Sequence, residues 1–335
     1  MRLIFVGFGM HGRRIATLAA ERGHDVVAIV DPALAGRPVT GFASSDHARA
    51  DVAELAPDLT ADAAVVTAPV DLAGLEEIAR ELLARGLDVV TIHPDAFDPP
   101  REWRERLDSL AKQHGVRMLG TGVQDVWWVH VPAVAAASMA RIDSVTITHH
   151  VDLDSLAVSV AQHLGAGLPE SEFVRLRDEV LSLDAPVLGG PLRVLATRLG
   201  LTPGEIERDI RPVTRDVATV WRSADRTVEA GELVGFSETS IVHTLEGVKL
   251  RGTIVTALLD EGATTVDEVT ISGDPELHLE HRPFPGGRIT DVVPVARLED
   301  IREAAPGFHT AAWLPPATYR HPADRPASRE TERQK

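Results

Sequence analysis

RLIFVGFGMHG, at residues 2–12, is the stretch that decides the fold. Its apolar first half predicts a buried strand, and the glycines that follow predict a tight turn. The next residues, RRIATLAAERG at 13–23, carry apolar side chains at helical spacing. A Gly-x-Gly-x-x-Gly motif that joins a strand to a helix is typical of a dinucleotide-binding βαβ unit.

The glycine-rich turn supplies six residues that we expect to bind the cofactor: Gly7, Phe8, Gly9, Met10, His11 and Gly12. In such a turn the first glycine permits the bend, the second lets the backbone approach a pyrophosphate, and the third lets the helix pack on the strand. A second strand at 25–30 ends in Asp31, whose carboxylate can accept both ribose hydroxyls and would repel a 2′-phosphate. The sequence therefore favours NAD, with NADP as the alternative because Arg37 follows six residues later.

Strands and helices continue to alternate as far as residue 125. Apolar runs at 63–68, 87–93 and 116–123 are typical of buried parallel strands, and amphipathic helices separate them. The pattern predicts an α/β protein whose N-terminal Rossmann domain, residues 1–125, contains a doubly wound parallel sheet. Ligands bind at the carboxyl ends of such strands, which adds four residues to the expected cofactor site: Thr67, Ala68, Pro69 and Gln124.

The second half of the chain has a different pattern. Residues 126–291 mix helical segments with alternating strands, which predicts an α+β domain on a mixed sheet for substrate binding and dimerisation. A strand at 141–153 carries His149 and His150, which we expect on opposite faces. A segment at about 292–318 is expected to pack back on the Rossmann domain, and the charged residues 321–335 are expected to form a disordered tail.

Composition limits the chemistry and the partners. The chain has no cysteine, one tyrosine and three lysines, which excludes thiol nucleophiles, thiolate-bound zinc and a Tyr-x-x-x-Lys relay. A net charge of −16 without a basic patch argues against nucleic acid and anionic membranes as partners. With no long apolar run or targeting segment, we expect a cytoplasmic protein, and we also expect a homodimer that binds no metal.

Four further strings complete a resemblance to a known family. They are GTGV at 120–123, HLGAG at 163–167, ISGDP at 271–275 and APGFHT at 305–310. Together with the glycine motif, and in this order, they resemble the 2,4-diaminopentanoate dehydrogenases and native amine dehydrogenases, whose fold is that of dihydrodipicolinate reductase. The resemblance runs from residue 1 to about 316. It implies hydride transfer between a nicotinamide and the amine or imine carbon of a small amine, ketone or imine.

The chain departs from that family at the expected catalytic position. The family has Cys-Glu-Glu after the fourth strand, whereas this chain has His93-Pro94-Asp95. A base must free the nitrogen lone pair before hydride can leave, and the resemblance implies that Asp95 or His93 takes this role. Asp125 is the substitute for Asp95, and His149 is a further candidate because His149-His150 resembles the His-His motif of dihydrodipicolinate reductase. Capping is the alternative role for both aspartates, and a structural role is the alternative for the histidine.

Two other functions stay open on the sequence alone. The missing glutamate pair is compatible with an imine or carbonyl reductase of a biosynthetic pathway, and equally with a non-catalytic NAD-binding regulator. Trp127, Trp128 and Phe173 either line an apolar substrate pocket or belong to the core.

Overall fold

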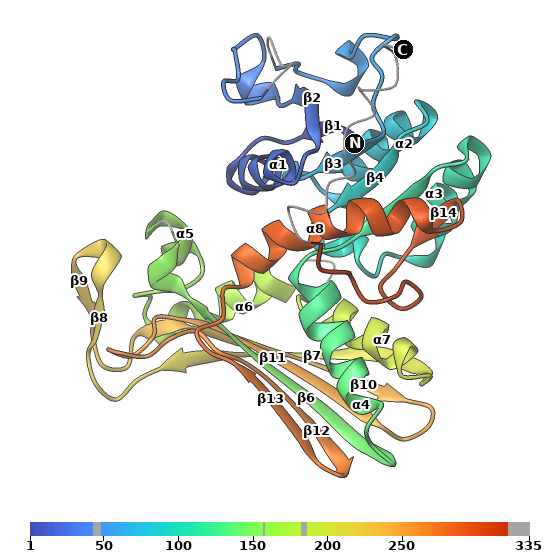
Figure 1. Cartoon of the computed structure of the whole chain (residues 1–335). Coiled ribbons are helices and arrows are strands. Elements are labelled where there is room, and N and C mark those ends of the chain that lie inside the picture. The colour runs from blue at the N-terminus through green and yellow to red at the C-terminus, as the bar shows by residue number, and fades with distance from the viewer. Residues whose placement is uncertain (43–47, 157, 182–185, 321–335) are drawn as a thin grey trace. The chain divides into compact units, whose positions relative to one another are not determined.

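The structure is a computed structural model that describes residues 1–42, 48–156, 158–181 and 186–320. The chain divides into two compact units (Figure 1). Unit 1 consists of Met1–Val126 and the chain from Gly287 onward, and unit 2 consists of Trp127–Gly286. The expected tail at 321–335 lies outside the described residues.

Unit 1 contains a parallel sheet of six strands. They are β1 (Arg2–Val6), β2 (Asp25–Val30), β3 (Ala63–Val66), β4 (Asp88–Thr91), β5 (Arg117–Gly120) and β14 (Gly307–His309). Their order is β14-β5-β4-β3-β1-β2, and every neighbouring pair is parallel. The chain runs from β1 to β2 on one side and then returns to β3 on the other, so the strand order reverses next to β1. The expected Rossmann fold is confirmed, with β14 as a sixth strand that the sequence pattern did not predict.

Helices cover both faces of this sheet. Unit 1 holds α1 (Met10–Glu21), α2 (Leu72–Ala84), α3 (Arg101–His114) and α8 (Gly286–Glu303), with short turns η1 (Pro32–Leu34), η2 (Val52–Glu54) and η3 (Pro94–Ala96). Leu3 and Phe5 of β1 pack in the core that α1 and α8 cover, and Ile4 and Val6 pack in the core that α2 and α3 cover. Because β1 is buried on both faces, its sequence is a continuous apolar run.

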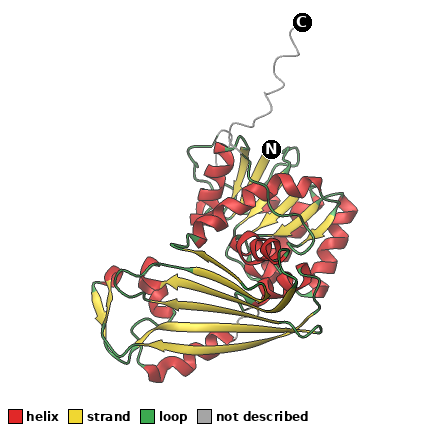
Figure 2. Ribbon diagram, turned by 60° about the horizontal axis from the view of Figure 1, so that its bottom comes forward, coloured by secondary structure: helices red, strands yellow, loops and turns green. Residues whose placement is uncertain are grey.

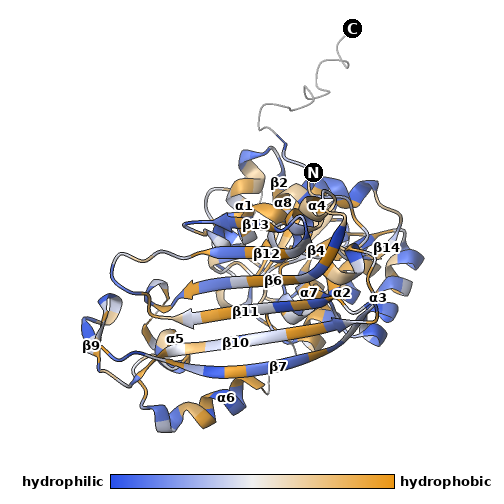
Figure 3. Cartoon of the chain, turned by 90° about the horizontal axis from the view of Figure 1, so that it is seen from below, coloured by the Kyte–Doolittle hydropathy of each residue, from blue (hydrophilic) through white to orange (hydrophobic). Residues whose placement is uncertain are grey.

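Unit 2 contains a mixed sheet of six long strands. They are β6 (Arg141–Asp152), β7 (Pro203–Thr214), β10 (Leu233–Thr244), β11 (Lys249–Ala257), β12 (Asp267–Asp274) and β13 (Leu277–His281). Their order is β13-β12-β6-β11-β10-β7, in which only β6 and β11 pair in parallel (Figures 2 and 3). A small ribbon of β8 (Thr219–Trp221) and β9 (Arg226–Val228) stands apart. The expected α+β architecture on a mixed sheet is confirmed.

The helices of unit 2 are shorter. They are α4 (Val131–Ala136), α5 (Val158–His163), α6 (Phe173–Leu181) and α7 (Gly189–Arg198), with turns η5 (Leu153–Ser155), η6 (Glu170–Glu172) and η7 (Arg222–Ala224). A π-helical segment, η4 (Gln124–His130), joins the units in sequence and leads into α4. Within the described ranges of the chain, none of the helices combines the length and the apolar character that a membrane span requires.

Two details of unit 2 differ from the sequence expectation. The sequence predicts one strand over residues 226–236, whereas the structure has two, because a turn with Gly231 at φ +84° separates β9 from β10. Strand β7 was not expected, because its sequence PGEIERDIRPVT is highly charged. The charges suit its place, since β7 is an edge strand that pairs only with β10, and charged side chains protect such edges from further pairing.

Candidate active site

A cavity of about 710 Å³ lies at the carboxyl ends of β1, β2 and β3. Ten of the residues that we expected to bind the cofactor line it: Gly7, Phe8, Gly9, Met10, His11, Gly12, Asp31, Thr67, Ala68 and Pro69. This is the point where the strand order reverses, which is where open α/β sheets bind their ligands. Gln124 is not among the lining residues; its amide donates to the carbonyl of Thr121, at 3.2 Å.

The three glycines of the turn have different surroundings. A Cβ on Gly7, where φ is +85°, would lie 2.5 Å from the amide nitrogen of Ala68, and a Cβ on Gly12 would lie 2.3 Å from the carbonyl oxygen of Gly7. Both glycines are therefore required by the packing of the protein itself. By contrast, no described atom lies within 4 Å of the Cβ position at Gly9.

The open space at Gly9 faces the start of helix α1. Gly9 is the N-cap residue, and in the described chain no side chain caps this helix and no acidic residue occupies its first turn. The free amides and the positive end of the helix dipole therefore suit an anion. These residues fit the diphosphate of a dinucleotide, with Gly9 allowing the close approach that any side chain would prevent.

Asp31, which directly follows β2, lines the same cavity. Its Oδ2 accepts a hydrogen bond from the amide of Phe8 at 2.7 Å, and its Oδ1 accepts one from the amide of Ala33 at 2.9 Å. Each carboxylate oxygen has two lone pairs, so this arrangement fixes the group and leaves acceptors for ribose hydroxyls. A second carboxylate, that of Asp51, also lines the cavity.

Replacing Asp31 with Asn should shift cofactor preference toward NADP. Removing the charge removes the repulsion of a 2′-phosphate, so the ratio of the Kd for NADPH to the Kd for NADH should fall by about tenfold or more. Asp51→Asn is the matched control, because Asp51 also caps a short turn at this cavity, through the amide of Ala53. Fluorescence titration of both variants measures the ratio. An unchanged ratio in Asp31→Asn, or an equal change in both variants, would contradict the role of Asp31.

His93 and Asp95 follow the carboxyl end of β4. The Nε2 of His93 lies 2.8 Å from the carbonyl oxygen of Val70, and its Nδ1 lies 3.3 Å from the amide nitrogen of Asp95. A carbonyl only accepts and an amide only donates, so Nε2 carries the proton and Nδ1 uses its lone pair. The ring therefore caps the η3 turn and ties it to the residues after β3. Both ring nitrogens of His93 are thus engaged by the local backbone, and Asp95 lies half-buried in η3.

Asp125 has a structural environment. It is fully buried, as is Arg297 of α8, and the two form a bidentate ion pair with distances of 2.8 Å from Nε to Oδ2 and 2.6 Å from Nη2 to Oδ1. The hydroxyl of Thr121 also donates to Oδ2 at 2.7 Å. The guanidinium donates in addition to the carbonyl of Pro315, at 2.8 Å. Asp125 thus links the end of β5 to α8 and to the segment that follows α8.

A buried carboxylate in unit 2 organises a second group of polar side chains. Asp267 of β12 is fully buried, and the indole nitrogens of Trp127 and Trp128 each donate to one of its oxygens at 2.7 Å. His149 is its cross-strand neighbour on β6, with Nδ1 2.9 Å from Oδ2. Among the described residues Nδ1 of His149 makes no hydrogen bond, so the two groups are in close contact without an aligned donor.

Aromatic rings enclose His149. Its centroid lies 5.3 Å from that of Trp128 and 5.1 Å from that of Phe284, both edge to face. Trp127 and Trp128 therefore belong to this polar and aromatic group. Phe173 packs in a separate hydrophobic core with Leu176, which is the core alternative that the sequence left open. Burial lowers the pKa of His150 below its usual value, against the opposing effect of Glu268, so His150 is favoured in its neutral form.

Sequence reasoning did not identify Asp267, Arg297 or Asp291. A signal for Asp267 was present, because it stands at an inward position of the alternating strand that continues with Val269 and Ile271, both buried. A charge at such a position indicates a buried polar network. Nothing comparable marks Arg297 and Asp291, whose sequence surroundings are those of an ordinary amphipathic helix.

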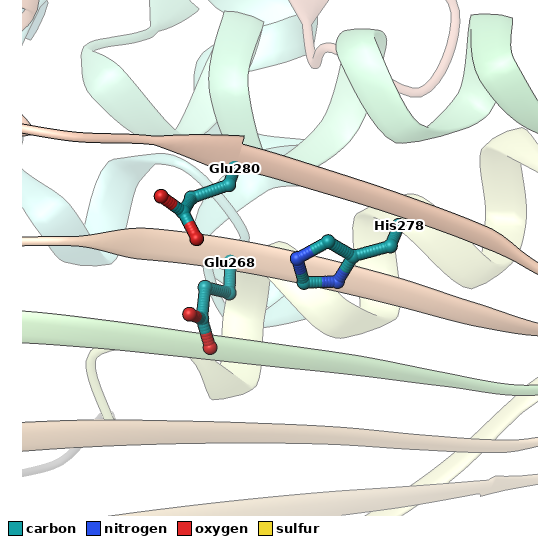
Figure 4. A group of neighbouring side chains, drawn as sticks. All are labelled: Glu268, His278 and Glu280. Carbon is teal, nitrogen blue, oxygen red and sulfur yellow. The ribbon is translucent and has the colours of Figure 1, made fainter.

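Glu268, His278 and Glu280 form the group of potential metal ligands found in the described residues (Figure 4). Their ligand atoms lie within 4.8 Å of one another on β12 and β13. Arg282 compensates part of the negative charge of this group, with Nε 3.0 Å from Glu280 and Nη2 3.9 Å from Glu268. The Nδ1 of His278 is 3.1 Å from the Thr270 hydroxyl. The absence of a metal stays a prediction.

Comparison with known families decides the classification. The model of the 2,4-diaminopentanoate dehydrogenase C-terminal domain matches residues 130–323, more than half of the chain. The chain belongs to this family. Residues 1–121 match the oxidoreductase family with an NAD-binding Rossmann fold. The expected resemblance to 2,4-diaminopentanoate dehydrogenases and the expected class of cofactor are confirmed.

Individual relatives agree with this membership of the 2,4-diaminopentanoate dehydrogenase family. The 2,4-diaminopentanoate dehydrogenase of Acetoanaerobium sticklandii is 24% identical over 228 residues, which span 67% of this chain but only 64% of that relative. The structure of an amine dehydrogenase from Mycobacterium smegmatis superposes with a TM-score of 0.82 at 25% identity, over 96% of this chain and 97% of the other. A myo-inositol 2-dehydrogenase from Lactobacillus plantarum, at 13% identity and a TM-score of 0.53 over 90% and 88% of the two chains, shares the fold.

Proposed function

We propose that this protein is an NAD-dependent oxidoreductase that acts on a small amine. The reaction is oxidative deamination, or in reverse the reductive amination of a ketone or aldehyde. The open space at Gly9 beside the uncapped start of α1 carries the proposal, because of the three glycines in the motif Gly9 alone has an open Cβ position. When bound, NAD would supply the nicotinamide ring that accepts the hydride from the amine-bearing carbon of the substrate.

Asp95 is the group that we assign to the substrate amine. Its carboxylate would hold the cationic ammonium, accept a proton from it, release that proton to solvent, and then accept a proton from the water that attacks the imine carbon. The capping of η3 by the ring of His93 supports this assignment, since it orders the backbone that carries Asp95. We further propose that residues of unit 2 bind the substrate, with His149, against Asp267, as a second acid-base group.

Turnover tests this proposal directly. The protein should oxidise at least one member of a broad amine panel at high pH with NAD, followed by NADH absorbance. Asp95→Asn should lower kcat by about 100-fold or more while the Kd for NADH stays within about twofold. Asp98→Asn, in the same loop three residues on, is the matched control and should keep wild-type kcat. Binding of NADH without turnover of any amine, or of any ketone or aldehyde with ammonium, would refute the proposal and favour a non-catalytic NAD-binding regulator.

A reductase acting on a preformed imine is the second candidate. The replacement of the family's glutamate pair by Pro94-Asp95 favours it, because one carboxylate rather than two remains to handle free ammonia. Ammonia as a substrate separates the two functions. An amine dehydrogenase should show a rate that rises with ammonium at fixed ketone, whereas an imine reductase should reduce only a preformed C=N bond.

We also propose that the protein is a cytoplasmic homodimer. Helix α7 packs on β7, β10 and β11, and alternate side chains of the sheet, including Thr146, Thr148, Thr253 and Thr270, are directed to the opposite face. A second copy of the chain would cover this face. Light scattering coupled to size-exclusion chromatography should give twice the monomer mass of 36.1 kDa.

A further inference from the structure

His11 differs from the other residues of the glycine turn because it is held from outside the turn. Its Nδ1 lies 2.6 Å from Oδ1 of Asp291, a residue 280 positions later on α8. His11 is about one third exposed and lines the cavity, whereas Asp291 is fully buried and does not line it. One edge of the imidazole therefore contacts the buried carboxylate, and the opposite edge is on the cavity side.

Asp291 requires a positive partner. A fully buried carboxylate is stable only when cations or hydrogen-bond donors compensate its charge. The closest cationic groups are His11 and the half-exposed Arg14, whose Nη1 is 3.8 Å from Oδ2. Oδ2 itself accepts no hydrogen bond from any described residue. Most of the compensation therefore comes from the short contact with His11, in which a carboxylate can only accept and Nδ1 must donate.

The second ring nitrogen of His11 is available. Among the described residues no group bonds its Nε2, and the two nitrogens of an imidazole project in nearly opposite directions. Because Nδ1 lies against Asp291 and the partly exposed His11 lines the cavity, Nε2 is the ring nitrogen that we assign to the cavity side. The first turn of α1 is the place where the helix amides and the space at Gly9 suit a diphosphate.

We infer that Asp291 holds the His11 ring so that its second nitrogen, Nε2, donates a hydrogen bond to the cofactor diphosphate. In this arrangement Nδ1 donates to Asp291 and Nε2 donates to a phosphate oxygen, so one ring bridges the buried carboxylate and the diphosphate. His11 is then a specificity-determining residue for diphosphate-containing ligands, and Asp291 is its positioning residue. This inference rests on the proposed function only for the identity of the cofactor.

Two substitutions separate the two nitrogens. In His11→Asn, the side-chain amide nitrogen lies near the position of Nδ1, and no donor replaces Nε2. In His11→Gln, the longer side chain places its amide nitrogen near the position of Nε2. Calorimetry with NADH, ADP-ribose and adenosine gives the readout, because ADP-ribose contains the diphosphate and adenosine does not. His11→Asn should weaken NADH and ADP-ribose about tenfold and leave adenosine unchanged, whereas His11→Gln should recover most of the affinity.

Arg14 supplies the control for these variants, and Asp291 supplies a further test. Arg14→Gln removes the other cation beside Asp291 and should change the Kd for ADP-ribose less than about threefold. Asp291→Asn, in protein shown by thermal melting to be folded, should weaken the binding of ADP-ribose as much as His11→Asn does.

Unchanged ADP-ribose binding in His11→Asn, or an equal loss of adenosine binding, would overturn the inference. Wild-type protein that binds ADP-ribose but oxidises no amine would refute the amine reaction and leave this inference standing; wild-type protein that binds neither NADH nor ADP-ribose would refute both.

Discussion

Gly9→Ala should weaken NADH binding about 100-fold while changing Tm by no more than about 2 °C. No described atom lies within 4 Å of the new methyl group, so the folded protein has room for it. The cofactor does not, because the methyl group would occupy the space that the diphosphate needs in order to reach the amides of α1. Titration of NADH by fluorescence and thermal unfolding of the same sample measure the two quantities.

Two other glycines make this test selective. Gly287→Ala, near the start of α8, adds a methyl group that likewise meets no described atom within 4 Å, and it should keep both NADH affinity and Tm. Gly12→Ala places its Cβ 2.3 Å from the carbonyl oxygen of Gly7, so it should lower stability as well as affinity. Wild-type affinity in Gly9→Ala would show that the ligand does not approach this part of the turn.

Arg297→Met should lower the free energy of unfolding by about 3 to 5 kcal/mol. Asp125 and Arg297 are both fully buried, and removing the guanidinium leaves the buried carboxylate without the bidentate cation that compensates its charge. Methionine fills most of the volume, so the loss measures the charge rather than a cavity. Denaturant unfolding followed by tryptophan fluorescence gives the free energy.

The control for this pair is another bidentate pair at the surface. Arg106 and Glu76 make two parallel contacts of 2.9 and 2.7 Å, yet the arginine side chain is about half exposed. Arg106→Met should leave the free energy of unfolding almost unchanged, because water replaces the lost partner. The double variant Asp125→Leu/Arg297→Met should recover part of the loss, since it removes the uncompensated charge. Equal losses at the buried and exposed pairs would contradict the role of burial.

Local patterns in the sequence predicted most of unit 1. The apolar runs that became β1 and β2 have the expected bounds, and the glycines and Asp31 lie within about 30 residues of one another, so their spacing alone indicates a shared cavity. Strand β14 could not be predicted in this way. It has three residues, and it forms a strand because β5 offers an open edge, which is a property of the folded sheet.

The polar networks escaped prediction for the same reason. Asp125 and Arg297 are 172 residues apart, and Trp128 and Asp267 are 139 apart, so no spacing rule connects them. The sequence does show that Asp125 follows a strand end, where a catalytic group and a structural group look alike. Only the position of Arg297 in the structure shows that the carboxylate of Asp125 is held in a buried ion pair.

The division of unit 1 between the two parts of the chain has a consequence for biosynthesis. Strand β14, helix α8, Asp291 and Arg297 all emerge from the ribosome after the whole of unit 2. A nascent chain that has reached residue 286 can complete the long sheet of unit 2, whereas its first five Rossmann strands still lack an edge strand, a covering helix and the partner of His11. Unit 1 is thus begun before unit 2 and completed only after it, so the helix and the strand that finish its fold join residues made much earlier.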